Sequence, residues 1–145
     1  MVFNQLMPRL QGYEKPDRAY GEVTRRAAVA IVLHEADGEL CLLMIRRAQR
    51  EGDPWSGHMA FPGGRRDPDD IDDRFCAIRE TREEIALDLD ALGSEVCALG
   101  EVNTGWRADR PEMLVAPFIY RVDQLPELDL NHEVDEVVSV PWRFL

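Results

Sequence analysis

A single acidic helix stands among several strand-like runs, and this order restricts the fold more than any other feature of the sequence. The helix is predicted to run from Asp72 or Asp73, either of which can be its N-cap, to about Ala86. Its predicted inward stripe consists of Phe75, Ile78, Arg82 and Ile85. One well-marked helix among many strands favours a mixed-sheet α+β sandwich over a doubly wound parallel fold.

Runs rich in Val, Ile and Leu flank this helix on both sides and predict strands. They cover residues 25–34, 39–46, 58–61, 94–102, 113–122 and 133–141. Asp37-Gly38 is the hairpin-turn signal between the first two runs. Residues 105–111 form a predicted loop, and residues 1–21 a short helix or an extended N-terminal arm. We therefore expect one α+β domain over residues 1–145, built around a mixed central sheet.

The net charge of -11 limits the partners of the chain. A surface this acidic argues against nucleic acid and against anionic membranes, because both require a basic footprint. A small anionic substrate would need a positive mediator, and a divalent cation is the obvious candidate.

Cysteine usage and the N-terminal residues bear on the compartment. The three cysteines, Cys41, Cys76 and Cys97, form no C-x-x-C pair, so we expect free thiols in a reducing environment. The first residues lack the apolar segment of a signal peptide, and no apolar run is long enough to span a bilayer. These features predict a soluble, cytoplasmic protein.

The helix concentrates carboxylates on one side. Glu80, Glu83 and Glu84 follow i, i+3, i+4 spacing, which places like charges close together and weakens a bare helix. One interpretation is a solvated face in which Arg79 pairs with Glu83. The other is a site for Mg²⁺ or Mn²⁺, which prefer hard oxygen ligands. Gly64, just before the helix, lets the backbone approach a metal or phosphate closely.

The segment 63–87 resembles the Nudix box, whose pattern is G-x5-E-x7-R-E-U-x-E-E-x-G-U with U a bulky aliphatic residue. The matching residues are Gly64, Arg79, Glu80, Glu83, Glu84 and Leu87. Four features depart from the pattern: Asp70 replaces the first Glu, Thr81 a U residue and Ala86 the late Gly, and the spacing to Arg79 is one residue longer. The resemblance covers residues 25–142 and implies a Nudix-type α/β/α sandwich.

The resemblance also implies roles for individual residues. Nudix enzymes hydrolyse a nucleoside diphosphate linked to another group. By resemblance, Mg²⁺ (or Mn²⁺) is held by Gly64, through its carbonyl, Glu80, Glu83 and Glu84. Arg79 would orient a glutamate by ion pairing. The general base is sought first at Glu83 or Glu84, and then at Glu133 or Glu136, for which an exposed strand edge is the alternative.

A second segment is similar to the signature of coenzyme A pyrophosphatases, approximately L-L-T-x-R-S-A-[SA]-x3-R-x3-G-x3-F-P-G-G. It runs without a gap from Leu42 to Gly64. Four positions differ, namely Met44, Arg47, Gln49 and Asp53, and the last stands where an arginine is expected. The substrate-binding residues expected from this segment are Arg46, Arg47, Arg50, Gly63 and Gly64.

Several alternatives stay open at this point. The substrate is expected to be coenzyme A or a thioester of it, or else ADP-ribose, a dinucleotide cofactor or a nucleoside triphosphate. A nucleotide sensor without activity and an acidic interaction domain are the other classes. The resemblance also allows a homodimer. Nudix domains usually carry a further terminal helix, so here that helix is absent, the chain is truncated at Leu145, or the N-terminal arm fills its place.

Overall fold

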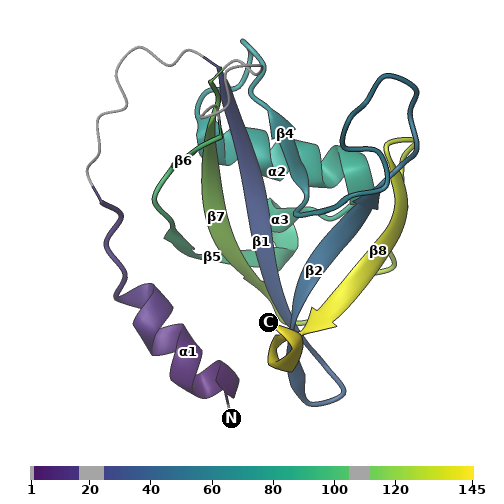
Figure 1. The fold of residues 1–145 in the computed structure, drawn as a ribbon. Helices are drawn as coiled ribbons and strands as arrows, with labels where there is room; N and C mark the ends of the chain where they lie inside the picture. Colours follow the sequence, from purple (N-terminus) through teal and green to yellow (C-terminus); the bar gives the residue numbers. More distant parts are fainter. Residues whose placement is uncertain (1, 17–24, 105–111) are drawn as a thin grey trace.

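A mixed β-sheet forms the centre of the computed structural model, which describes residues 2–16, 25–104 and 112–145 (Figure 1). The strands are β1 (Arg26–Ala36), β2 (Glu39–Arg47), β3 (Met59–Ala60), β4 (Gly63–Arg65), β5 (Gly93–Ala98), β6 (Val102–Asn103), β7 (Leu114–Val122) and β8 (Val134–Pro141). The helices are α1 (Val2–Gln11), α2 (Asp73–Ile85), α3 (Leu89–Leu92) and the short 3-10 helix η1 (Trp142–Phe144).

The strand order is β3-β2-β1-β7-β5, with β4 also paired to β1, β6 to β7 and β8 to β2. β1 and β7 are parallel, whereas the other recorded pairs are antiparallel. A parallel pair needs a long crossover, and the chain between β1 and β7 supplies one that includes α2. The predicted mixed sheet is confirmed.

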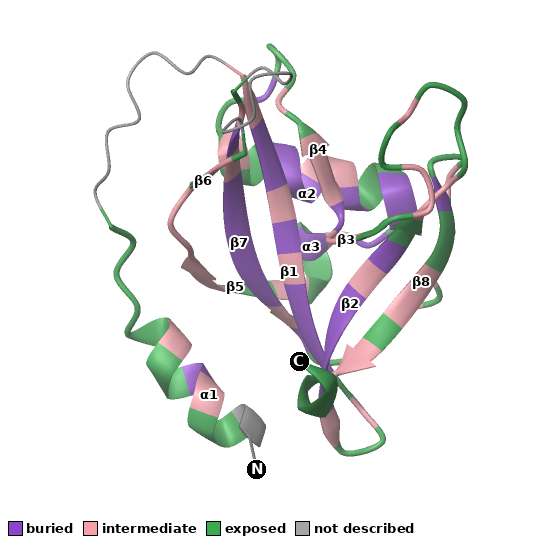
Figure 2. Ribbon diagram, in the orientation of Figure 1, coloured by how far each residue is buried: buried purple, intermediate pink, exposed green. Residues whose placement is uncertain are grey.

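Alternation along the strands gives the sheet two apolar faces. One face packs against α2 and includes Ala28, Ala30 and Val32 of β1. The opposite face includes Leu33 of β1 and Ile119 of β7, and there α1 contributes its buried Met7. Figure 2 shows that most of β1, β2 and β7 is buried between these layers.

Helices therefore cover both faces of the sheet, and the predicted α+β sandwich is confirmed. Figure 1 shows α1 and α2 on different sides of it. The N-terminal arm supplies the cover on the face opposite α2, through the contacts of α1 with β2 and β5. Residues 17–21 of the predicted arm lie outside the described part of the chain, as does the predicted loop 105–111.

Some sequence-based boundaries were wrong. The run 94–102, predicted as one strand, forms β5 and β6 with a break between them, and α3 was not predicted from the sequence. The inward stripe of α2 was also partly wrong: Phe75 and Arg82 are exposed, whereas Thr81 and Glu84 are buried. The N-cap is Asp72, whose side chain accepts a hydrogen bond from the Phe75 N–H. As a result, one glutamate of the helix points toward the sheet.

Two further findings concern the thiols and the helices of the protein. Its three cysteines are free thiols. Within the described residues, every helix is too short or too polar to cross a bilayer.

Candidate functional site

Three carboxylates converge at one end of α2. Glu80 and Glu84 come from the helix, and Glu133 comes from the segment just before β8. One oxygen from each lies within 4.8 Å of the oxygens of the other two. The chain between Glu84 and Glu133 includes α3, β5, β6 and β7, so the cluster depends on the tertiary fold.

Glu84 is the most enclosed member, with 2% of the residue exposed. Its Oε1 accepts a hydrogen bond of 2.8 Å from the Gly63 N–H. Burial raises the pKa of Glu84 to about 8, although the Gly63 hydrogen bond opposes this shift. Gly63 has φ +155°, and a Cβ at this position would lie 2.2 Å from the Ala28 carbonyl oxygen. Only glycine can therefore bring the backbone N–H to Glu84 without a backbone shift.

Glu80 lies against Gly64. A Cβ added to Gly64 would come within 2.6 Å of the Glu80 carboxyl carbon, so the missing side chain leaves room for this carboxylate. Burial raises the pKa of Glu80, and the neighbouring Arg79 partly offsets that effect. The Gly64 carbonyl oxygen accepts a weak hydrogen bond of 3.5 Å from the Cys76 thiol.

Backbone contacts hold Glu133 beside the helix. The Asn131 N–H donates to the Glu84 carbonyl at 3.0 Å, which fixes the segment to the last turn of α2. The Glu133 N–H donates to Asn131 Oδ1 at 2.9 Å, and its carbonyl accepts from the Ala48 N–H at 2.9 Å. The Glu133 backbone is thus tied on both sides, while its side chain is about half exposed.

Arg79 and Glu83 lie next to the cluster rather than in it. Glu83 is 54% exposed at the side chain and pairs with Arg79 at 3.2 Å. Arg79 also contacts Glu80 at 3.1 Å and binds both oxygens of Asp70 at 2.8 and 2.9 Å. The three glutamates of the predicted helix face are therefore divided: two enter the cluster, and Glu83 stays outside with the arginine.

Asp70 is a structural partner of Arg79. In the sequence it stood out only as a departure from the Nudix pattern. Its side chain is 1% exposed, and besides Arg79 it accepts a hydrogen bond of 2.8 Å from the Asp67 N–H. The Arg79 hydrogen bonds lower the pKa of Asp70 to about 2, although burial opposes this shift. Asp70 thereby fixes the arginine that contacts Glu80 and Glu83.

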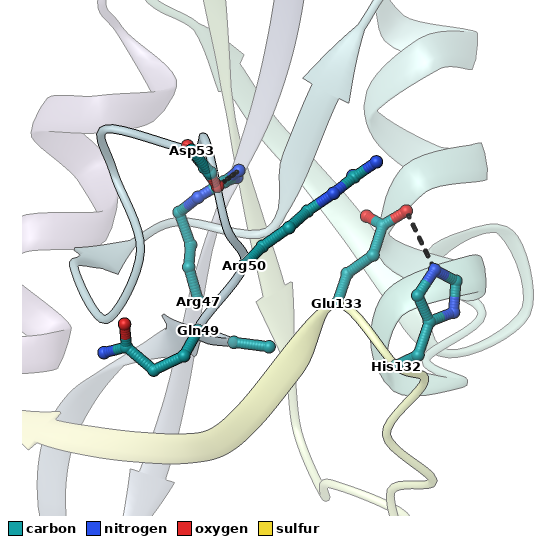
Figure 3. Close-up of a pocket in the computed structure, with 7 residues that line it drawn as sticks. Arg47, Gln49, Arg50, Asp53, His132 and Glu133 are labelled. Carbon is teal, nitrogen blue, oxygen red and sulfur yellow. Dashed lines mark hydrogen bonds and ion pairs between the residues drawn. The ribbon is translucent and has the colours of Figure 1, made fainter.

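A cavity of about 400 Å³ adjoins the cluster at Glu133 (Figure 3). We call it the Arg50 cavity, and its lining residues are Arg47, Ala48, Gln49, Arg50, Asp53, His132 and Glu133. Arg47 pairs with Asp53 at 2.9 Å. Arg46, the third arginine expected to bind substrate, is not among the lining residues and pairs with Glu136 at 3.2 Å. Two of the three expected arginines therefore face a common cavity.

The donor set of the cluster fits a hard divalent cation. It offers carboxylate oxygens from three residues, which is the ligand chemistry of Mg²⁺ and Mn²⁺. Burial of Glu84 disfavours its charged form, and a bound cation would compensate for that cost. Gly64, whose carbonyl the resemblance implied as a metal ligand, borders Glu80, and its carbonyl oxygen accepts a hydrogen bond from the Cys76 thiol.

Two contacts near the site could not be predicted from the sequence, because they depend on how the chain folds. The opposite charges of Arg47 and Asp53 are the only sequence signal for their ion pair across the loop. The contact of Asn131 with Glu84, which positions Glu133, has no sequence signal, because it involves backbone groups.

Comparison with known proteins gives the context of this site. The family model described as the NUDIX domain matches residues 24–143. An uncharacterised protein of Schizosaccharomyces pombe is 38% identical over 104 residues, or 70% of this chain and 31% of that protein. The human mitochondrial coenzyme A diphosphatase NUDT8 is 34% identical over 127 residues, or 82% of this chain. The chain spans 49% of that enzyme, about half of its length.

The fold also has a counterpart among solved structures. The crystal structure of a C. elegans Ap4A hydrolase in a binary complex superimposes with a TM-score of 0.68 at 19% identity, covering 82% of this chain and 81% of the other. This similarity concerns the fold, and the family assignment rests on the domain model, which covers most of the sequence. The chain belongs to the Nudix family.

Proposed function

We propose that the chain hydrolyses the diphosphate linkage of a nucleoside diphosphate derivative with the help of Mg²⁺ or Mn²⁺. The observation that carries this proposal is the convergence of Glu80, Glu84 and Glu133 beside a cavity that contains two arginines. Membership of the Nudix family supports the same reaction class.

Glu80 and Glu84 are suited to hold the cation. Glu84 is fixed by the Gly63 N–H, and Glu80 is enclosed beside Gly64, so little rearrangement is needed for their carboxylates to act as ligands. The cation, when bound, neutralises the diphosphate and lowers the pKa of the attacking water. Arg79 keeps Glu80 and Glu83 in place through ion pairs.

Glu133 is our choice for the general base. It lines the cavity and its side chain is about half exposed, so both water and substrate can reach it. Glu84 is buried, and Glu83 and Glu136 pair with Arg79 and Arg46 at 3.2 Å. The contact of Glu133 with His132 is longer, at 3.8 Å, and involves a positive charge only when the imidazole is protonated. A carboxylate oxygen of Glu133 would accept the proton of the attacking water.

Coenzyme A or one of its thioesters is the substrate that we propose first, with 3′,5′-ADP and 4′-phosphopantetheine as products. The similarity of segment 42–64 to the coenzyme A pyrophosphatase signature supports this choice, as does the relationship to NUDT8. We also propose a cytoplasmic location, because free thiols are typical of reducing compartments.

The test is product analysis with Mg²⁺ on coenzyme A, ADP-ribose, NADH, diadenosine polyphosphates and dGTP. The Glu80→Gln/Glu84→Gln double variant serves as the blank. Asp90→Asn, which removes an exposed carboxylate of α3, is the matched control. We expect cleavage of coenzyme A by the wild type and Asp90→Asn, and none by the double variant. Cleavage of another compound would retain the reaction class and reject the substrate.

Glu133→Gln tests the base. We expect kcat to fall about a hundred-fold, with little change in melting temperature, because the side chain is half exposed and only its proton-accepting oxygen is lost. An unchanged kcat would remove Glu133 from this role. Tight binding of one compound by the wild type without turnover of any would instead favour the sensor alternative.

A further inference from the structure

The loop 66–72, between β4 and α2, has little apolar packing to hold it. Ile71, its one large apolar residue, is 79% exposed. The loop also borders a cavity of about 360 Å³, lined by Arg26, Arg66, Asp67, Pro68 and Asp70. Because apolar burial contributes little there, polar contacts must fix the position of the loop.

Arg66 supplies such contacts at the far end of the loop. Its Nη1 donates to Asp73 Oδ1 at 3.2 Å, and its Nη2 donates to the carbonyls of Asp70 and Ile71 at 3.5 and 3.3 Å. The Arg66 N–H donates to the Arg26 carbonyl at 2.9 Å, so the residue is itself anchored on β1. Its side chain thus joins the first residue of the loop to the end of the loop and to the start of α2.

These contacts fall where the chain departs from the Nudix pattern. The pattern places x7 between its first Glu and its Arg, whereas residues 71–78 separate Asp70 from Arg79, which is one residue more. An extra residue within a helix would rotate the helix before it by about 100°, so the end of the loop is where it is accommodated. Asp70 is also one methylene shorter than Glu, and its backbone must therefore lie closer to Arg79.

Asp70 relates the position of the loop to that of the carboxylate cluster. It binds Arg79 Nε and Nη2 at 2.8 and 2.9 Å. Arg79 Nη1 in turn donates to Glu80 at 3.1 Å, and Glu80 belongs to the cluster with Glu84. A shift of the loop would therefore displace Arg79 and leave the Glu80 carboxylate without a fixed partner.

We propose that Arg66 is a positioning residue for the carboxylate cluster. It latches the end of the loop 66–72, so that Asp70 reaches Arg79 and Arg79 holds Glu80 in place. Arg66 acts through these residues and is not itself a ligand of the cation. This inference rests on the proposed function, because it concerns the same cation site.

Mg²⁺ binding measured by calorimetry tests the proposal without turnover. Arg66→Gln removes the latch, and Arg66→Lys keeps the charge but loses the planar fork that serves several acceptors at once. Arg26→Gln is the matched control. It removes the same charge, and the Arg26 guanidinium binds Asp73 and Glu101 instead of the loop carbonyls. Melting temperatures would establish that each variant is folded.

We expect Arg66→Gln to raise the Kd for Mg²⁺ about ten-fold, the loss typical of a residue that supports a metal ligand. Arg66→Lys should raise it less, and Arg26→Gln by less than about two-fold. The direction is informative, because the loss of a positive charge near the cluster would by itself favour Mg²⁺. A weaker affinity therefore reports misplaced ligands and not a changed charge.

Two further measurements separate a latch from a general loss of stability. The N–H groups of Asp67 and Asp70 are hydrogen-bonded within the loop, and their hydrogen exchange should be faster in Arg66→Gln than in Arg26→Gln. In an Asp70→Asn background, Arg66→Gln should change the Kd for Mg²⁺ by less than about two-fold, because the connection through Asp70 is already broken. If that double variant does not fold, Arg66→Lys takes the place of Arg66→Gln in the same comparison.

The proposal would be overturned if Arg66→Gln matched the wild type in Kd and in amide exchange, or if Arg26→Gln lost as much affinity. Failure of the proposed function gives a different result. A wild type that bound no Mg²⁺ would reject metal ligation by Glu80 and Glu84, and this inference with it. Mg²⁺ binding that depends on Arg66, together with no cleavage of any compound, would reject the hydrolase and retain the latch.

Discussion

At the scale of single residues, the two adjacent glycines before α2 have different tasks. Gly63 is needed because its backbone passes close to Ala28 and donates to Glu84. Gly64 is needed because the Glu80 carboxylate occupies the space that a side chain would fill. Gly63 therefore serves both the sheet and Glu84, whereas Gly64 makes room for Glu80.

The substitutions Gly63→Ala and Gly64→Ala should separate these tasks. In Gly63→Ala the new Cβ meets backbone at 2.2 Å, so unfolding free energy should fall by roughly 3 kcal/mol. In Gly64→Ala the Cβ meets the end of a side chain that can move, so the loss should be about 1 kcal/mol, with Mg²⁺ affinity reduced about ten-fold. Urea unfolding and calorimetry measure the two quantities. Equal destabilisation by both substitutions would contradict this assignment.

Asp70 gives a prediction about pH. Asp70→Asn removes one partner of the buried pair with Arg79 and should lower unfolding free energy by about 3 kcal/mol at neutral pH. The pKa of Asp70 is lowered from 3.8 to about 2 in the folded protein. The ionised Asp70 therefore contributes its full stabilisation above pH 3.8, the ordinary pKa of the group. This stabilisation is lost as the pH falls through about 2, the pKa in the folded protein.

The gap in stability between wild type and Asp70→Asn should therefore narrow from about pH 4 to about pH 2 in urea titrations. Asp72→Asn is a suitable control, because asparagine also caps a helix well and the α2 cap should survive. A gap that stayed constant to the lowest pH would show that Asp70 is not held ionised by Arg79.

At the scale of elements, helix α1 excludes water from one face of the sheet. It contacts β2 and β5, and its buried Met7 joins the cluster that includes Leu33 and Ile119. The sequence of the arm left its conformation open between helix and extended chain, because a ten-residue segment with an internal proline has weak helical propensity. Packing on the sheet decides in favour of the helix.

Met7→Ala should lower the free energy of unfolding by roughly 2 kcal/mol, since Met7 is only 8% exposed and packs between α1 and the sheet. Arg9→Ala, at an exposed position of the same helix, should change it by less than about 0.5 kcal/mol. Thermal unfolding of the two variants beside the wild type measures both values. A Met7→Ala protein as stable as Arg9→Ala would mean that α1 contributes nothing to the core.

Sequence reasoning succeeded where an element is long and periodic, and failed where tertiary contacts decide. The runs that became β1, β2 and β7 and the helix α2 were predicted closely, because burial repeats along each of them. α3 and β4 are too short to show a period. The burial of Glu84 was missed because a carboxylate in an inward position breaks the apolar pattern from which the stripe was predicted.

The same division holds for the candidate site. Helical spacing sufficed to bring Glu80 and Glu84 together, since both lie on one element. Spacing alone did not separate Glu83 from them. Arg79, which pairs with Glu83, is held by Asp70, and that contact forms only after the loop 66–72 has folded. The place of Glu133 depends on a backbone hydrogen bond from Asn131, which no side-chain pattern reports.

At the scale of the whole molecule, metal binding and protonation are coupled through Glu84. Its pKa is raised from 4.5 to about 8 in the folded protein without metal. The protonated form therefore stabilises the metal-free protein at low pH, and this stabilisation is lost as the pH rises through about 8. A cation binds the ionised carboxylate, so it competes with the proton and its effect grows with pH.

Mg²⁺ should accordingly raise the melting temperature more at about pH 8.5 than at about pH 6. Glu84→Gln cannot ionise, so most of this difference should vanish in that variant. Asp90→Asn, which replaces an exposed carboxylate, should retain the difference between the two pH values. The measurement is a thermal scan with Mg²⁺ and with EDTA at both pH values. If Mg²⁺ raised the melting temperature of the wild type equally at both pH values, a ligand role for Glu84 would be contradicted.

The parallel pairing of β1 with β7 makes neighbours of residues far apart in the chain, such as Ala28 and Ala116. Contacts of such long range form late, because the entropy of closing the intervening chain must be offset first, and folding then takes roughly milliseconds to seconds. Glu133 comes later still in the sequence and is set by the docking of Asn131 on Glu84. A chain still emerging from the ribosome thus carries Glu80 and Glu84 without their third partner, and the complete carboxylate cluster arises only once synthesis has passed Glu133.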